Sequence, residues 1–384
     1  MKLQLRFLTA AAVMAAAVSA PCAKALVSLQ DGLDHVYVDA SVEFAYDSNV
    51  FANAQSGGSF STQGSLGMEF ARRAGWIGVN ATASLDFARY ANFRDQDYID
   101  PKITAELTKQ TGRTTGSLTM SVAREDRTDV TVNTRDTSWN YAAGIDVQYP
   151  VIERYSLTGT LDYAQTDYTD RTLFTNQNTY TGNLYLYYIL DDERDLFIDG
   201  RTRYTNESNG ETDVDRALSG GVSGQIYGPF NGSVQVGYQE RTPSGGPDHG
   251  DFQDVTATGT TTWNINRRIT VTGNLSRDFS TTALAQSIES TSAGLTFQDS
   301  LTAKASTTLS AEVGENRFLG VAGEIQPGGK RRIDEFIGTT ASYFYTINEH
   351  LKFSITYTYY QGFSTLDYAV FSRDQVFFQV QSHW

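Results

Sequence analysis

The sequence predicts an all-β chain that closes into a transmembrane antiparallel up-and-down β-barrel of about eighteen strands, with about sixteen as the alternative. Three observations carry this prediction. Apolar and polar side chains alternate along most of the chain, short and long connections alternate, and the chain ends on an aromatic residue. The 384 residues are 40% hydrophobic and 12% aromatic, with no long apolar run after the N-terminus. Helical membrane spans and a disordered chain are therefore excluded.

The first 25 residues have the features of a secretory signal peptide. A basic start is followed by an apolar run over residues 7–20 and by a small-x-small cleavage site that ends at Ala25. We therefore expect residues 1–25 to be removed and residues 26–384 to form a single barrel domain. Cys22 is a poor lipidation site because a proline precedes it, so the mature chain is expected to lack cysteine.

Composition also limits the chemistry of the chain. One cysteine and four histidines exclude a disulfide scaffold and disfavour a cysteine-rich or histidine-rich metal centre. The net charge is −14, and the predicted signal peptide contains only basic charges, so the mature chain is more acidic still. Nucleic-acid binding needs a basic face and is disfavoured. We expect no cofactor, no metal and no catalytic residues.

Period-two alternation is clearest in residues 353–359, where Phe, Ile and two Tyr occupy one face and Ser and two Thr the other. Residues 38–46, 79–87 and 157–163 show the same pattern. Because successive side chains of a strand point to opposite faces, each segment has one apolar and one polar face. No segment after residue 37 has a convincing helical period.

Turn signals recur along the chain and mark two kinds of connection. Short turns are expected near residues 74–75, 112, 152–153, 192–193, 229–230, 267, 301 and 348. Longer polar stretches lie between them, at 54–59, 92–97, 125–136, 167–178, 206–213, 242–251, 280–287, 316–332 and 362–373. This asymmetry is typical of outer-membrane barrels, which have short periplasmic turns and longer external loops.

A membrane location explains why the strands must close. Unpaired backbone groups at an open sheet edge find no water in hydrocarbon, so only helices and closed barrels span a bilayer. Aromatic residues near the expected strand ends fit the girdles found at both membrane interfaces. These residues are Trp76, Tyr90, Trp139, Tyr149, Tyr155, Tyr180 and Trp263.

The C-terminus has the most specific signal. Val376, Phe378, Val380 and Trp384 fall on one face of a final strand, a pattern that resembles the assembly signal of outer-membrane barrels with Trp in place of the usual Phe. Together with residues 42–51 and 371–378, this chain resembles the outer-membrane β-barrel porin families, including barrels encoded near exopolysaccharide and exosortase loci. The resemblance implies an outer-membrane location more firmly than it implies a substrate.

Charged residues on the polar strand faces are the candidate pore lining. The candidates are Asp39, Glu43, Glu69, Asp86, Lys102, Glu106, Asp146, Asp162, Asp199, Arg201, Arg203 and Glu312. A barrel of this size has a water-filled lumen, and rings of charge set its ion selectivity. Acids outnumber bases, so we expect a weak preference for cations. The alternative is that these residues form lumenal ion-pair ladders with no selective role.

The external stretches contain acidic clusters, but none has the loop pattern of a calcium site. The clusters are Asp95, Asp97 and Asp100; Asp126 and Asp129; Asp167 and Asp170; and Asp248, Asp251 and Asp254. Residues 316–332 are the stretch expected to fold inward and narrow the pore. Its basic end, residues 330–332, would then contact lumenal acids or anionic lipid at the surface.

These observations favour a passive pore for small solutes in the outer membrane. Its expected partners are outer-membrane lipid and lipopolysaccharide, and the barrel-assembly machinery during biogenesis. A component of polysaccharide export or a structural surface barrel is the alternative. An outer-membrane hydrolase is less favoured, because among the histidines only His249, beside Asp248, falls in an external stretch. A secreted β-solenoid is disfavoured by the long hairpin interval and by the terminal aromatic.

Overall fold

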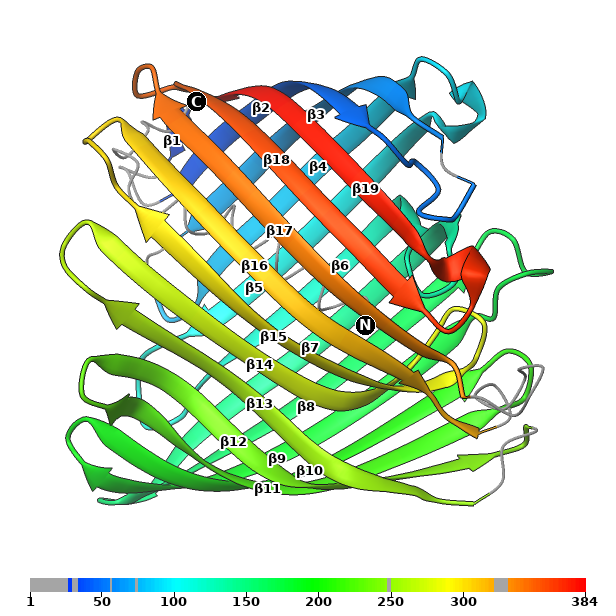
Figure 1. The fold of residues 1–384 in the computed structure, drawn as a ribbon. Helices are drawn as coiled ribbons and strands as arrows, with labels where there is room; N and C mark the ends of the chain where they lie inside the picture. Colours follow the sequence, from blue (N-terminus) through cyan, green and yellow to red (C-terminus); the bar gives the residue numbers. More distant parts are fainter. Residues whose placement is uncertain (1–26, 30–33, 56, 73–74, 247–249, 321–330) are drawn as a thin grey trace.

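Eighteen strands close into a barrel in the computed structural model, which describes residues 27–29, 34–55, 57–72, 75–246, 250–320 and 331–384. Strand β2 (Asp34–Asp47) pairs with the last strand, β19 (Phe371–His383), and so closes the wall (Figure 1). A short strand, β1 (Val27–Leu29), pairs with the start of β2. The predicted fold and the larger strand number are confirmed. The predicted signal peptide, residues 1–25, lies outside the described residues.

The other strands follow in chain order, each antiparallel to its two neighbours. They are β3 (Ser59–Arg72), β4 (Gly78–Tyr90), β5 (Tyr98–Lys109), β6 (Thr115–Asp129), β7 (Thr134–Ile152), β8 (Tyr155–Tyr168), β9 (Gln177–Asp191), β10 (Arg194–Glu207), β11 (Thr212–Tyr227), β12 (Phe230–Ser244), β13 (Phe252–Asn264), β14 (Ile269–Thr281), β15 (Ser287–Asp299), β16 (Ala305–Phe318), β17 (Ile333–Thr346) and β18 (Leu351–Ser364).

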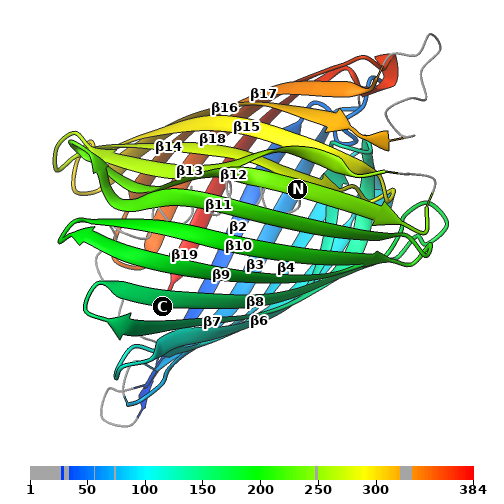
Figure 2. The same ribbon diagram turned by 90° about the horizontal axis from the view of Figure 1, so that it is seen from below.

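The short turns lie at one end of the barrel, together with the start of β2 and the end of β19. We call this the periplasmic end (Figure 2). All eight turns fall where the sequence predicts them. The other end, which we call external, differs from the prediction in one respect. Residues 125–136 were expected to form a loop, yet β6 continues to Asp129 and β7 begins at Thr134. Polar strands continue there because they no longer face lipid.

The alternation places apolar residues on the outer surface. Phe44 is 60% exposed, Leu66 57% and Leu161 66%, which is expected only where lipid replaces water. Gly64 shows how tightly this surface is covered, because a Cβ there would lie 2.4 Å from Cζ of Phe87. A ring from β4 therefore folds over the backbone of β3.

Aromatic pairs mark both interfaces. At the periplasmic end Tyr155 packs on Tyr188 with ring centroids 5.2 Å apart, and Phe230 packs on Trp263 at 5.5 Å. Near the external end Tyr180 packs on Tyr163 at 5.1 Å. Such rings have an apolar body and a polar tip and suit the boundary between lipid and water.

Two single-turn 3-10 helices, residues Arg94–Gln96 and Asp367–Ala369, lie in external connections. The described part of the chain contains no helix with the length and apolar character of a membrane span.

Candidate functional site

The candidate pore-lining residues all lie on the inner strand face. In each strand they alternate with the exposed apolar row, as Glu43 does with Val42 and Phe44, and as Glu312 does with Val313. This placement holds for Asp39, Glu43, Glu69, Asp86, Lys102, Glu106, Asp146, Asp162, Asp199, Arg201, Arg203 and Glu312. The structure brings Arg201 and Arg203 into one cluster. Asp146 and Asp162 lie diagonally across the β7–β8 pair, within reach of each other's field.

The tip of the β14–β15 hairpin leaves the wall. Pairing between β13 and β14 ends at Ala257 and Arg277, but pairing between β14 and β15 continues to Thr281 and Ser287. Residues 278–288, which we call the arm, are thus attached to the wall on one side only. The arm bends into the lumen, because its backbone and side chains contact inward-facing residues of β10–β12.

A cluster of ion pairs fixes the root of the arm. Arg201 donates two hydrogen bonds to the Asp278 carboxylate, at 2.9 and 2.7 Å, and Arg203 donates a third at 3.0 Å. Arg203 also donates to the Asp215 carboxylate at 2.7 Å. Three guanidinium–carboxylate contacts on one acid of the arm are short and charge-assisted, and such bonds are about twice as strong as neutral ones.

Arg241 completes the cluster from β12. Its side chain is buried, and it donates two hydrogen bonds to the Asp215 carboxylate at 2.6 and 2.8 Å. It also lies 3.2 Å from an Asp213 oxygen and donates to the Ser280 carbonyl of the arm at 2.9 Å. A buried guanidinium with this many acceptors is fully compensated, so it holds the arm without leaving a free charge.

The end of the arm crosses the lumen to the opposite wall. The backbone N–H of Thr175, in the β8–β9 connection, donates to the Ala283 carbonyl at 2.9 Å. Ala283 packs in a buried apolar cluster with Tyr168 and Phe174, to which Leu284 and Val132 add their side chains. Five strands separate β8 from β14 in the wall, so these contacts span the pore.

A second hairpin leans in from the other side. Pairing of β5 with β6 ends at Ala123, and pairing of β7 with β8 ends at Ser138, so residues 124–137 form a free tip, which we call the opposing tip. Its Thr131 is buried and its carbonyl accepts a hydrogen bond from Arg332 at 3.0 Å. By the shorter way around the closed wall, six strands separate β6 from β17, which follows the connection that contains Arg332.

The external opening of the barrel, which we call the mouth, also contains residues with an unusual backbone conformation. The non-glycine residues with positive φ in the described part of the chain are Ala52, Asn133 and Ala285. Each lies in a different element of the mouth, and the Asn133 side-chain amide donates to the Ala52 carbonyl at 3.1 Å. Strained positions of this kind persist only where surrounding contacts determine them, and they are common at functional sites.

Between the two hairpins and the wall lies a cavity of about 610 Å³. It is lined by threonine and serine hydroxyls together with apolar groups such as those of Ala142 and Phe279, with Asp129, Asp162 and Asp278 and three arginines at its edges. The threonines include Thr119, Thr128, Thr131, Thr166, Thr179, Thr181, Thr205, Thr281 and Thr282. A small hydrated solute can enter such a space, because the hydroxyls replace water as hydrogen-bond partners.

The arginines that hold the arm and the opposing tip are neutralised by paired carboxylates. Besides the arm cluster, Arg135 pairs with Asp126 at 2.5 Å and Arg332 with Asp334 at 2.6 Å. In contrast, Asp162 has no basic group within 4.0 Å among the described residues. The sum of these contacts leaves the lumen with surplus negative charge.

Some of the residues that shape the mouth were missed by the sequence reasoning. Asp215 and Asp278 were not singled out, and Arg241 stood next to a stretch assigned to a loop. Strand parity was the available signal, because Arg203, Asp215 and Arg241 are directly opposite one another in three consecutive strands. The stretch expected to fold inward, residues 316–332, is described only in part. The described C-terminal end of this stretch is held inward through Arg332. The arm, which also folds inward, is a shorter connection.

The histidines do not assemble a hydrolytic site in the described residues. His383 lies at the periplasmic end with Nδ1 2.6 Å from an Asp39 oxygen, and His350 stacks on Trp384 with ring centroids 4.1 Å apart. His249, the candidate in an external stretch, lies outside the described residues. Within the described residues, no group of three metal-ligating side chains is present at the acidic clusters or elsewhere.

The C-terminal residues form a continuous outer row. Val376, Phe378 and Val380 are opposite Tyr46, Phe44 and Val42 of β2, so the last strand and the first barrel strand share one lipid-facing surface. Trp384 continues this row at the periplasmic end.

A family model described as "Putative beta-barrel porin 2" matches residues 35–383, which is nearly the whole described barrel. The chain belongs to this porin family. It is an outer-membrane β-barrel, and the predicted location and resemblance are confirmed. Family and fold point to a channel rather than to an enzyme. No curated protein matches the sequence.

Three solved structures are similar to this chain in fold. OccAB2 of Acinetobacter baumannii has a TM-score of 0.51 at 10% identity, over 93% of this chain and 99% of its own. OccK2 (OpdF) of Pseudomonas aeruginosa, solved in complex with glucuronate, has a TM-score of 0.50 at 9% identity, over 91% and 97%. The FrpB iron transporter of Neisseria meningitidis has a TM-score of 0.51 at 10% identity, over 88% and 64%. At such identity these likenesses concern the fold alone.

Proposed function

We propose that this porin is a passive diffusion pore for small hydrophilic solutes, and that its external mouth, between the arm and the opposing tip, sets the size limit. The observation that carries this proposal is the arm itself. A polar hairpin held in the lumen by Asp278 and buried arginines has no role in closing the wall, which the eighteen paired strands already do.

A preference for cations follows from the charge balance of the lumen. The arginines of the arm cluster and Arg332 are paired with carboxylates, so they contribute little field. Asp146 and Asp162 lie below the mouth and keep their charge available to passing ions. An acidic lining concentrates cations and repels anions. The acids that pair with arginine therefore act structurally, and those without a base act in selectivity.

Two partners belong to this proposal. The final strand presents Val376, Phe378, Val380 and Trp384 as the signal that the barrel-assembly machinery binds during insertion. Once inserted, the external half of the barrel lies among lipopolysaccharide molecules, and its outward apolar row contacts their acyl chains. Both partners are proposed from the exposed outer row and from the position of the barrel in the outer membrane.

Single-channel recording in planar bilayers tests the pore. Purified protein is expected to give discrete, long-lived conductance steps and a reversal potential of cation-selective sign in a salt gradient. Faster migration of the unboiled protein on a denaturing gel provides the control for a folded barrel. A folded barrel that gives no steps contradicts the pore and favours a structural or partner-dependent role. Steps with anion preference contradict only the selectivity.

A further inference from the structure

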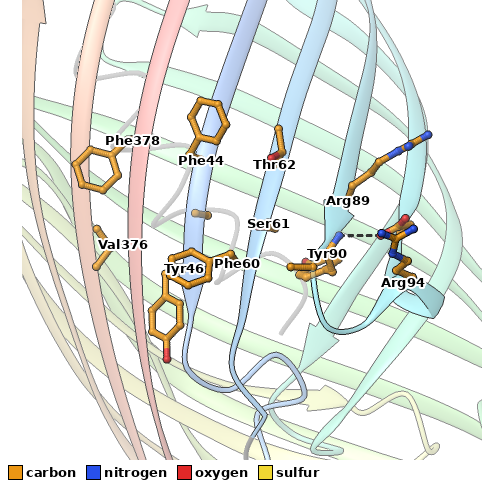
Figure 3. A pocket seen from close by; sticks show the side chains of 13 residues that line it. Phe44, Tyr46, Phe60, Ser61, Thr62, Arg89, Tyr90, Arg94, Val376 and Phe378 are labelled. Atoms are coloured by element: carbon orange, nitrogen blue, oxygen red, sulfur yellow. Dashed lines mark hydrogen bonds between the residues drawn. The ribbon is translucent and has the colours of Figure 1, made fainter.

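An apolar trough lies on the outer surface at the external half of β2, β3, β4 and β19, with a volume of about 390 Å³ (Figure 3). Phe44 and Tyr46 line it from β2, Phe60 from β3, and Val376 and Phe378 from β19. Tyr46 and Phe60 pack with ring centroids 4.9 Å apart. These side chains face the membrane, so the trough is open to lipid and closed to the pore.

The floor of the trough is low because of one small side chain. Thr62 is directly opposite Phe44 on one side and Arg89 on the other. The aromatic rings and the arginine rise on either side of this threonine, as Figure 3 shows. The depression has the width of one side chain and runs from the external rim toward the middle of the membrane.

The rim end of the trough is basic. Arg89, near the end of β4, and Arg94, in the following connection, are both exposed. Within the described part of the chain, neither guanidinium lies within 4.0 Å of a carboxylate. Asp97 also lines the rim, but one of its oxygens accepts the backbone N–H of Tyr90 at 2.7 Å.

Two other outward-facing arginines in the external half have acidic partners. Arg277 lies 2.8 Å from both Asp254 and Glu289, and Arg317, near the end of β16, forms an ion pair with Glu315. An outward arginine costs about 2–4 kcal/mol at the bilayer midplane and about 0–1 kcal/mol near the interface. Two unpaired guanidiniums above an apolar trough therefore call for an anionic partner with a long apolar part.

We propose that this trough binds the phosphorylated, acylated glycolipid of the outer leaflet, the lipid A part of lipopolysaccharide. Arg89 and Arg94 hold a phosphate group by charge-assisted hydrogen bonds, which guanidinium groups form readily. One acyl chain lies in the trough over Thr62, between the side chains of Phe44 and Arg89. This inference rests on the proposed function, from which it takes the orientation of the barrel and the presence of lipopolysaccharide around it.

Native mass spectrometry of the detergent-solubilised protein tests this site. The probes are bisphosphorylated hexa-acyl lipid A, the same lipid without phosphates, and phosphatidylglycerol. We expect the bisphosphorylated lipid to bind best. The double variant Arg89→Gln/Arg94→Gln is expected to bind it at least about tenfold more weakly. Arg317→Gln is the matched control, because it removes an outward guanidinium that is paired with an acid, Glu315, and it is expected to keep the affinity.

A second variant tests the trough separately from the charges. Thr62→Trp fills the floor with a lipid-compatible ring and keeps both arginines, and it is also expected to weaken binding. Unchanged affinity in the double variant, equal loss in Arg317→Gln, or equal binding of phosphatidylglycerol would overturn the proposal. Conductance is measured on the same samples. Loss of lipid binding with normal conductance steps concerns this site alone, whereas absence of steps in every sample concerns the proposed pore.

Discussion

The two ends of the barrel are built from the same strands and differ in how those strands finish. At the periplasmic end neighbouring strands stay paired up to tight turns, as β12 and β13 do through Phe230 and Trp263. At the external end the β14–β15 hairpin loses its β13 neighbour and the β6–β7 hairpin loses both neighbours, and they lean inward as the arm and the opposing tip. Where lipid contacts the wall, apolar alternation keeps each strand in register. Where water surrounds both faces, ion pairs decide the direction of the chain.

Shortening the arm is expected to give the largest effect among the tests of this comparison. If residues 282–286 are replaced by an Asn-Gly turn, the arm loses the tip that packs on Tyr168 and Phe174, while the wall keeps every strand pairing, including Thr281 with Ser287. Single-channel conductance is expected to rise about twofold or more, because the narrowest section dominates the resistance of a pore. Planar-bilayer recording measures the change. Unchanged conductance in a correctly folded variant would place the constriction elsewhere.

Asp278→Asn tests the cluster that fixes the arm. The substitution removes the charge that Arg201 and Arg203 share. Arg203 keeps its pair with Asp215, but Arg201 is left partly buried without a counter-charge, which destabilises the inward position of the arm by on the order of 2 kcal/mol. We expect frequent transitions to a larger conductance. The control is Asp299→Asn, which breaks the pair with Arg268 at the periplasmic end. Transitions of equal frequency in the control would argue against a specific role of the arm.

Ion selectivity is expected to depend on the lumenal acids without a basic partner and not on those that are paired with arginine. The double variant Asp146→Asn/Asp162→Asn is expected to lower the cation-to-anion permeability ratio by about a factor of two, because two uncompensated lumenal charges disappear. Reversal potentials in a salt gradient measure the ratio. Asp100→Asn is the matched control, since Arg124 already neutralises that carboxylate at 2.7 Å. If both variants shift the reversal potential alike, pairing has no bearing on selectivity.

The smallest effect is expected at the periplasmic end. Trp384→Ala removes the ring that stacks on His350, an interaction of about 0.5–1.5 kcal/mol, and shortens the outer row of the last strand. The yield of folded barrel on an unboiled gel should fall, and the conductance of the barrels that form should stay the same. Trp384→Phe keeps an aromatic ring and should restore the yield. A changed conductance would show that the two ends are coupled.

The wall was predictable from the sequence and the mouth was not. Alternation such as that of residues 353–359 reports which face contacts lipid, and this local signal identifies strands and turns all around the barrel. The path of the arm depends on Asp278 meeting Arg201 and Arg203, which lie 77 and 75 residues away in the chain. Residues 321–330 of the stretch expected to fold inward lie outside the described residues, so that expectation stays a prediction. The arm is a short connection, and its course follows from charges at its root and from apolar contacts of Ala283 at its tip.

The arm is attached to the wall on one side only, so the size of the pore opening can change without a change in the barrel wall. Because residues 278–288 share no backbone pairing with β13, insertions, deletions or charge changes there can alter what passes through the pore while every seam of the wall is kept. The same barrel wall can therefore admit a different solute after about a dozen residues are substituted. Selection on permeability and selection on insertion into the membrane can then proceed independently.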